Sequence, residues 1–391
     1  MRTKNYLWAV LAAATLSLDA CVSGENEIIE PQNPTKMEAR LELTLKGAPA
    51  NTRSTGAALP TTANEEKISR VAVAIFDKDG KVLIIREFAK TEEKYTVNCA
   101  AGENCTGIVV VNAPEKHFAG IDTKTNFRKK LITLSQDATA LPMSGDIKSG
   151  SGDAATTTFT LQAGKTSTLS AEVSRLVARV SISSIKTDFD ASGQYAKATF
   201  KLKKVFLHKT QSTYPADPKT PTDQPFNANL KTGWWDSSVT STHEDKLADE
   251  VGGSTGTAIT ATPYTTPYWF YAFPNGNTNS TRLVLFGSFD PDGEPAAGVP
   301  ANKAAEDVYY PIVVNKLQTG TTINDGTSNV TSAVAGKGDG TLARNTTYAI
   351  TATIKGKGAD SPDADMNPAT LTLTVEVAGW ALNIKQDVEF N

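Results

Sequence analysis

Residues 378–391 read AGWALNIKQDVEFN, and their pattern decides how the rest of the chain is interpreted. The side chains of one parity are apolar except at Gln386, and the apolar ones are Leu382, Ile384, Val388 and Phe390. Because successive side chains of a β-strand point to opposite faces, this alternation predicts a half-buried strand. Residues 40–46 (RLELTLK) alternate in the same way, with leucine at every second position. The fold depends on whether these strands complete their own domain or a second copy of the chain.

The composition indicates a β-rich protein. The chain has 391 residues, which is enough for two domains, and its formal net charge of -3 is spread without blocks of one sign. Binding to nucleic acid needs a basic face that neutralises phosphates, so this class of function is disfavoured. Thr, Ser, Gly, Val and Ala are abundant, as in extracellular β-proteins with many turns.

The start of the chain has the features of an export signal. A basic beginning precedes an apolar run at 6–18 that is too short to span a membrane comfortably. The run ends at Cys21 in a sequence that resembles the lipobox of bacterial lipoproteins, although Asp19 departs from the usual small or aliphatic residue. We expect residues 1–20 to be a signal peptide and Cys21 to carry a lipid. An ordinary secretory signal is the alternative.

The remaining cysteines suggest a disulfide. Cys99 and Cys105 flank a short segment, and in an oxidising compartment two such cysteines pair if their Cα atoms come within about 7 Å. We therefore predict a Cys99–Cys105 disulfide. The three histidines lie far apart and no CxxC motif is present, so the sequence offers no metal site.

Short alternating segments separated by turn residues cover most of the chain. The strands expected in the first half lie at 40–46, 68–76, 81–88, 95–97 and 107–112, with a hairpin at 156–161 and 167–173 and a helix at 121–136. A second group begins at 174–187, pairs with 199–208, and continues at 282–289, 308–314, 348–354 and 370–377. Segment 211–266 reads as a long, irregular connection. This spacing predicts an all-β protein with two β-sandwich domains.

Candidate catalytic motifs do not combine into an active site. GKT at 164–166 resembles the end of a phosphate-binding loop, but it joins two strands instead of opening a helix. DKDG at 77–80 and DPDG at 290–293 lack the remaining ligands of a calcium loop and are typical of turns. No GxSxG motif is present. We expect no enzymatic activity, cofactor or metal.

Two aromatic clusters are the candidate ligand surface. Trp234 and Trp235 form one cluster, and residues 268–273 (YWFYAF) form the other. Flat aromatic side chains stack on sugar rings, but they also supply large buried areas to a core. Burial in the second sandwich is the favoured interpretation.

Several stretches together resemble the major fimbrillin (FimA-like) family, which forms the shaft of the type V pili of Bacteroidetes. In order they are the signal ending at Cys21, NTRS at 51–54, ISRVAVAIF at 68–76, the Cys99 segment leading to IVVVN at 108–112, SRLVARVSISSIKT at 174–187, YYPIVVN at 309–315, RNTTY at 344–348 and EVAGW at 376–380. The resemblance covers essentially the whole chain and is weakest at 211–266.

The resemblance implies a polymerising subunit with two transthyretin-like sandwiches in tandem. A propeptide at 21–53 would precede an N-terminal domain at 54–173 and a C-terminal domain at 174–391. An arginine-specific protease would cut between Arg53 and Ser54 and release the first strand, and the C-terminal strand of a neighbour would fill the groove. The implied partners are identical subunits, accessory pilins, host or bacterial surface receptors and, through the precursor's lipid, the outer membrane.

Three functions stay open at this point. A shaft subunit needs both a donor strand and a cleavable loop, and Arg53 lies in a loop of small residues, whereas Arg40 and Arg70 fall inside expected strands. A tip pilin would not need the donor strand, and an anchor pilin would keep its N-terminal segment. A glycan-binding lipoprotein held at the surface through Cys21 is the alternative from another class. The last strand could also close its own C-terminal domain.

Overall fold

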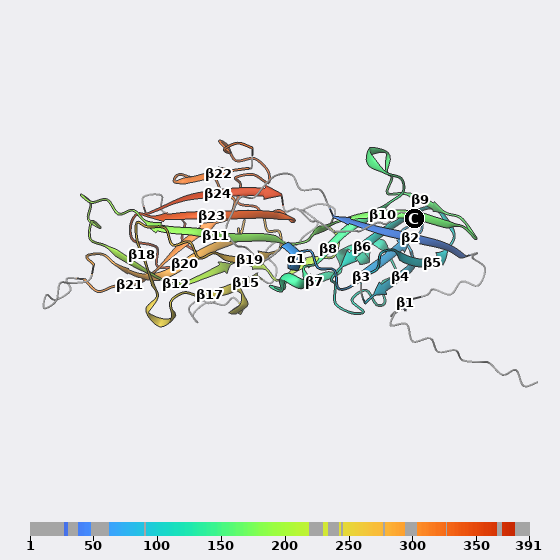
Figure 1. Ribbon diagram of the computed structural model, residues 1–391, viewed down its shortest axis with the longest axis horizontal. Helices are drawn as coiled ribbons and strands as arrows, with labels where there is room; N and C mark the ends of the chain where they lie inside the picture. Colours follow the sequence, from blue (N-terminus) through green and yellow to red (C-terminus); the bar gives the residue numbers. More distant parts are fainter. Residues whose placement is uncertain are drawn as a thin grey trace, which may run out of the picture.

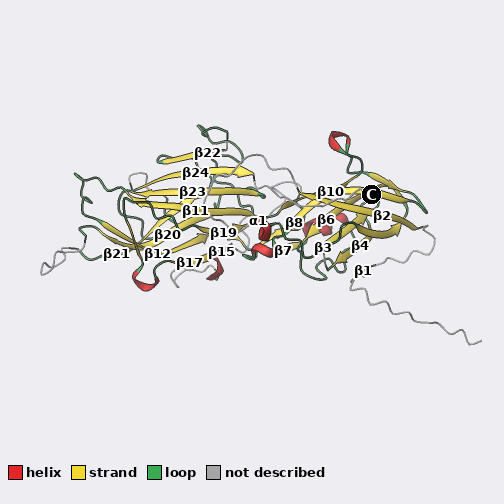
Figure 2. Cartoon of the chain, viewed as in Figure 1, coloured by secondary structure: helices red, strands yellow, loops and turns green. Residues whose placement is uncertain are grey.

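The computed structural model describes residues 27–29, 38–47, 62–89, 91–218, 230–233, 242–243, 245–276, 278–293, 303–325, 327–365 and 370–379. Strands make up most of these residues, and the helices are short (Figure 2). Figure 1 shows an elongated molecule, in which strands from the first half of the chain gather at one end and later strands at the other. The predicted all-β fold with two sandwiches is confirmed.

The first half is one folded sheet of nine strands in the order β1-β4-β3-β6-β8-β10-β2-β5, with β9 paired to β6. The strands are β1 (Glu27–Ile29), β2 (Glu38–Gly47), β3 (Val71–Phe76), β4 (Val82–Phe88), β5 (Tyr95–Ala100), β6 (Gly102–Val111), β8 (Met143–Lys148), β9 (Phe159–Leu161) and β10 (Thr166–Arg175). Every residue of β3 is buried, as expected for a central strand covered on both faces. β8 pairs with both β6 and β10 and so joins the two layers.

The second half has two facing sheets. One has the order β19-β11-β23-β24-β22, and the other has the order β17-β12-β20-β21, with β18 also paired to β12. The strands are β11 (Ala178–Thr187), β12 (Thr199–His208), β17 (Ala248–Glu250), β18 (Thr257–Ile259), β19 (Tyr268–Ala272), β20 (Arg282–Asp290), β21 (Glu306–Val313), β22 (Thr321–Asn324), β23 (Thr346–Ile354) and β24 (Leu371–Gly379).

The connections carry short elements. They are α1 (Thr62–Glu65), α2 (Lys124–Lys129), β7 (Leu131–Thr133), β13 (Thr210–Gln211), β14 (Thr213–Pro215), β15 (Leu230–Thr232), β16 (Thr242–His243) and the 3₁₀ turns η1 (Ala138–Ala140), η2 (Gly152–Ala154), η4 (Asp245–Leu247) and η5 (Gly253–Thr255). The segment predicted to be a long irregular connection therefore contains several short strands. Within the described ranges, no helix is long and apolar enough to span a membrane.

Three predicted local features are wrong. The helix expected at 121–136 ends at Lys129, because the next residues form β7 and pair with β14 of the second half. The expected hairpin of 156–161 with 167–173 does not form: β9 pairs with β6, while β10 pairs with β2 and β8. The strand at 199–208 is present as β12, but it lies in the sheet opposite β11. In each case a partner distant in sequence replaces the adjacent one.

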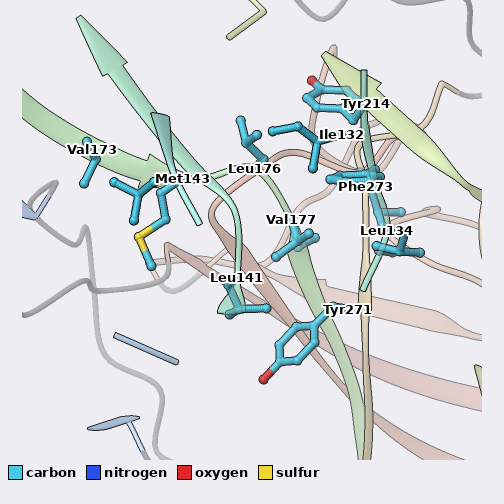
Figure 3. Close-up of a cluster of buried hydrophobic side chains, with 14 of the residues drawn as sticks. Ile132, Leu134, Leu141, Met143, Val173, Leu176, Val177, Tyr214, Tyr271 and Phe273 are labelled. Carbon is cyan, nitrogen blue, oxygen red and sulfur yellow. The ribbon is translucent and has the colours of Figure 1, made fainter. Parts of the chain in front are cut away.

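The two halves meet in a continuous apolar core, which we call the joint. The chain passes from β10 to β11 through Leu176 and Val177 alone, and both residues are fully buried. Figure 3 shows side chains of the first half beside those of the second; the labelled ones are Ile132, Leu134, Leu141, Met143, Val173, Leu176, Val177, Tyr214, Tyr271 and Phe273. Pairing of β7 with β14 adds a small shared sheet. An interface that is apolar and hydrogen-bonded disfavours free movement of the halves.

Candidate assembly site

The strand β2 occupies a slot between two other strands. It runs parallel to β10, with residues 40–47 beside 166–173, and antiparallel to β5, with residues 38–43 beside 95–100. Among the described strands, β5 pairs with β2 alone. Neighbouring strands lie about 4.8 Å apart, so removing β2 would leave two unpaired strand edges facing each other across about 10 Å.

One face of β2 is apolar, and its side chains pack into the core of the first half beneath the slot. Its buried side chains are Ala39, Leu41, Leu43 and Leu45, each at most 5% exposed. The predicted alternation of this strand is therefore confirmed. Opposite them on β5 lie Cys99, Val97 and Tyr95. Burying each leucine contributes about 1.5–3 kcal/mol through removal of apolar surface from water.

The outer face of β2 is polar. Arg40 and Lys46 are exposed, and Glu42 lies 3.5 Å from the Arg40 guanidinium and 3.9 Å from the Lys94 ammonium. Exposed ion pairs of this kind contribute about 0–1 kcal/mol. The apolar face and the two hydrogen-bonded edges therefore hold β2 in the slot.

The two cysteines lie on the successive strands β5 and β6. Cys99 faces Ala39 across the β2–β5 pair, and Cys105 lies on β6 with its Sγ packed over Gly102. Both are buried thiols, so the predicted disulfide is absent from the structure. The residues between them do not form a loop, because β5 runs to Ala100 and β6 begins at Gly102. Burial, together with the neighbouring Cys105, raises the pKa of the Cys99 thiol to about 12.

The other predicted site residues lie outside the described part of the chain. They are Cys21, Arg53, Ser54, Leu382, Ile384, Val388 and Phe390, and the aromatic pair Trp234 and Trp235. The structure does place the residues that flank them. Gly47 and Thr62 bound the segment that contains Arg53, and Gly379 precedes the last stretch.

These flanking residues all lie at the joint. Because β2 is parallel to β10, its end at Gly47 lies beside Val173. The helical turn α1 lies between the two halves in Figure 1. At the other end of the chain, Gly379 pairs with Thr346 of β23, and Asn345 donates its backbone N–H to the carbonyl of Val177 at 2.9 Å. The segment that contains Arg53 and the C-terminal stretch therefore both adjoin the described structure at the joint.

A buried carboxylate ties α1 across the joint. Glu65 is 1% exposed and accepts from the Arg179 guanidinium at 2.8 Å and from the Tyr271 hydroxyl at 2.7 Å. The Glu65 carbonyl accepts from Arg175 Nε at 3.2 Å. Burial, and then the charge of Glu65, raises the pKa of Tyr271, while burial lowers the pKa of Arg175 to about 10.

Gln136 adds a second tie from the first half to β19. Its Oε1 accepts from the Tyr271 backbone N–H at 2.8 Å and its Nε2 donates to the Tyr271 carbonyl at 2.7 Å. Sequence reasoning missed these contacts. A usable signal was the pair Arg175 and Arg179 within the apolar stretch SRLVARVSI, because two buried cations require a buried anion.

The aromatic cluster at 268–273 is core, as favoured from the sequence. Tyr268, Phe270, Tyr271 and Phe273 are all at most 9% exposed, and only Trp269 reaches 37%. In the part of the chain that the structure covers, no group of three or more His, Cys, Asp or Glu could hold a metal ion.

Comparison with known proteins agrees with this architecture. Residues 39–183 match the family described as major fimbrial subunit protein (FimA). A fimbrilin from Porphyromonas gingivalis aligns over 90% of this chain and 99% of its own at 17% identity, with a TM-score of 0.61. A protein described as a cell adhesion protein, from Bacteroides eggerthii, aligns over 91% of this chain and 98% of its own at 18% identity, with a TM-score of 0.59.

No curated protein matches the sequence. The identities to the solved structures are low, so those likenesses show the fold alone. The strand β2, the slot around it and the joint all lie within or beside the matched residues 39–183. Residues 39–183 therefore carry the sequence signature of the major fimbrial subunit family, and the fimbrilin fold extends along most of the chain.

Proposed function

We propose that this chain is a shaft subunit of cell-surface fimbriae that polymerises by donor-strand exchange. The observation that carries the proposal is the position of β2, which bridges β10 and β5 in the sheet yet is followed at Gly47 by the segment that contains Arg53. Cleavage between Arg53 and Ser54 disconnects β2 from the remainder of the fold. Residues 21–53 are then the propeptide, and residues 54–173 and 174–391 form the two domains.

Loss of β2 creates the demand for a replacement strand. The backbone groups of β10 and β5 lose their partners, and unpaired buried N–H and C=O groups are costly. The apolar core residues that pack against the three leucines of β2 become exposed to water as well. A strand from a neighbour restores the hydrogen bonds on both edges and supplies alternating side chains that pack against this core.

The C-terminal stretch has the pattern that this replacement requires. Its apolar side chains, Leu382, Ile384, Val388 and Phe390, alternate as the inward side chains of β2 do. Slot and donor belong to different parts of the subunit, so the contact is heterologous and repeats into an open filament. Such a filament displays many copies of one subunit and suits adhesion to host or bacterial surfaces.

The precursor and its partners follow from the same proposal. Lipid on Cys21 holds the precursor at the outer membrane until an arginine-specific protease acts. Identical subunits then form the shaft, and accessory pilins begin or end it. Glycan binding through an aromatic platform has less support, because Trp269 is the one exposed ring among the aromatic residues at 268–273.

The test is maturation of the purified precursor. Treatment with an arginine-specific protease should yield a new N-terminus at Ser54 by N-terminal sequencing, and filaments should appear by electron microscopy. The Arg53→Ala variant serves as the matched control and should stay monomeric. A mature N-terminus at Cys21 or beyond Arg70, or filaments formed by the Arg53→Ala variant, would contradict the proposal.

A further inference from the structure

Arg344 connects the second half of the molecule to the strands beside the β2 slot. It directly precedes Asn345 and β23, and its guanidinium reaches into the first half. Nε donates to the Arg175 carbonyl at 3.1 Å, and Nη2 donates to the Ser174 carbonyl at 2.7 Å. Nη2 also lies 3.2 Å from both the carbonyl and the hydroxyl oxygen of Ser144. One side chain therefore joins the ends of β8 and β10 to the start of β23.

The surroundings of Arg344 are buried and acidic. The Ser144 hydroxyl accepts from Arg344 and donates to Asp217 Oδ1 at 3.0 Å, and Asp217 is 6% exposed. Arg128 Nη1 lies 3.0 Å from Asp217 Oδ2. Burial lowers the pKa of the Arg344 guanidinium, and the charge of Asp217 opposes that shift. Hydrogen bonds that involve a buried ionised group are about twice as strong as neutral ones.

The two elements proposed for assembly meet at this side chain. β10 is the strand that lies beside β2 in the slot, and it ends at the carbonyls that Arg344 binds. β23 begins two residues after Arg344, and its first residue, Thr346, pairs with Gly379. The C-terminal stretch therefore starts from a strand pair whose position Arg344 sets against β10.

We propose that Arg344 is a positioning residue for assembly. It fixes the start of the C-terminal donor stretch, at Gly379, relative to β10 at the edge of the slot. Each subunit then adds to the filament as one rigid unit. This inference rests on the proposed function, because it assigns Arg344 a part in donor-strand exchange. The coupling of the two halves is a separate consequence that does not require polymerisation.

Arg282 provides a matched control. It is also a largely buried arginine, and its Nη1 donates to the backbone carbonyls of Pro362, at 3.2 Å, and Ala364. These contacts lie entirely within the second half. Replacing Arg282 with methionine removes a comparable set of hydrogen bonds and leaves the joint intact.

The experiment compares Arg344→Met, Arg344→Lys and Arg282→Met with the wild type. Calorimetric unfolding of the uncut proteins should show one transition for the wild type and for Arg282→Met, and two for Arg344→Met. After cleavage, the assembly rate per folded subunit should fall about tenfold or more in Arg344→Met, since charge-assisted hydrogen bonds to three backbone carbonyls are lost. Arg282→Met should assemble within about twofold of wild type at equal folded fraction.

Arg344→Lys should restore part of the assembly rate, because an ammonium donates to carbonyls but lacks the fork of the guanidinium. It also carries the comparison if Arg344→Met does not fold. The inference is overturned if both Arg344 variants unfold in one transition and assemble as Arg282→Met does. If cleaved wild type forms no filaments, the proposed function fails, and the number of unfolding transitions still decides whether Arg344 couples the two halves.

Discussion

His208 is a buried base whose titration affects stability. It is 1% exposed at the end of β12, with Nδ1 2.7 Å from the Thr232 hydroxyl and Nε2 3.1 Å from Asp363 Oδ1. Burial lowers its pKa from 6.5 to about 4, against the opposing effect of the Asp363 carboxylate. The ring is therefore neutral in the folded protein at neutral pH.

The lowered pKa predicts loss of stability in mild acid. Between pH 6.5 and about 4 the unfolded chain takes up the His208 proton first, so the unfolding free energy falls as the pH falls through this window. The contribution that disappears is about 3 kcal/mol for one group with this shift. In urea unfolding at pH 7 and pH 4.5, His208→Gln should lose less stability between the two pH values than the wild type. Equal losses in the two proteins would show that His208 does not titrate in this way.

Adjacent residues of β2 provide a direct test of its burial. Leu43 is fully buried beneath the sheet, whereas Thr44 points to the outer face. In the uncut precursor, Leu43→Asp should lower the unfolding free energy by at least about 3 kcal/mol, because it places a carboxylate in an apolar core. Thr44→Asp should cost about 1 kcal/mol or less. Similar losses for both, measured by urea unfolding, would mean that β2 is not seated in the slot.

At the level of single residues, the sequence predicted which apolar side chains are buried but not which polar side chains cross the joint. The leucines of β2 were predictable, because alternation reports which face is buried. Glu65, Gln136 and Arg344 were not, since each is held by hydrogen bonds to residues more than 100 positions away. Polar residues of this kind carry no periodic signal, and only the chain's return to the joint brings their partners together.

At the level of elements, strand existence was predictable and strand pairing was not. The strand at 199–208 was located to the residue, and a strand expected at 370–377 was found at Leu371–Gly379. Both patterns are local. Pairing is not local: the residues between β11 and β12 cross from one sheet to the other, so β12 pairs with later strands and not with β11. The helix at 121–136 was shortened for the same reason, because β7 finds its partner in the second half.

Truncation after Gly379 separates the two possible roles of the last stretch. Under donation, the truncated subunit should keep a near-normal melting temperature, because residues 371–379 of β24 are retained with their pairing to β23 and β22. After cleavage it should form no filaments by electron microscopy. A large drop in the melting temperature of the uncut monomer would instead assign the stretch to its own C-terminal domain.

The two faces of the donor stretch should differ in their effects. Ile384→Asp together with Phe390→Asp should abolish assembly, since each buried side chain contributes about 1.5–3 kcal/mol and an unpaired carboxylate in an apolar groove costs more. Replacing Lys385 and Glu389 by alanine is the matched control on the other parity and should leave assembly nearly unchanged. Comparable filament yields from the two double variants would show that the side chains of Ile384 and Phe390 do not face an apolar groove.

At the level of the whole molecule, the fold places the end of β2, the start of α1 and the end of β24 around one joint. The tandem sandwich architecture was predictable from strand spacing and family resemblance. The rigidity of the joint was not, because it depends on the buried residues Leu176 and Val177, on the β7–β14 pair and on charges that meet only in the folded chain. If the proposed polymerisation occurs, a joint of this kind keeps each subunit from bending at its middle.

Donor-strand exchange requires that the slot vacated by β2 accepts the C-terminal stretch of a neighbour. It is tested most directly with subunit that lacks residues 380–391, cleaved after Arg53 and freed of its propeptide, to which a synthetic peptide of residues 380–391 is added. The peptide should bind one to one by native mass spectrometry and raise the melting temperature, while a peptide with Ile384→Asp and Phe390→Asp should do neither. If the unmodified peptide neither binds nor stabilises the cleaved subunit, the C-terminal stretch does not fill the slot and assembly by donor-strand exchange is excluded.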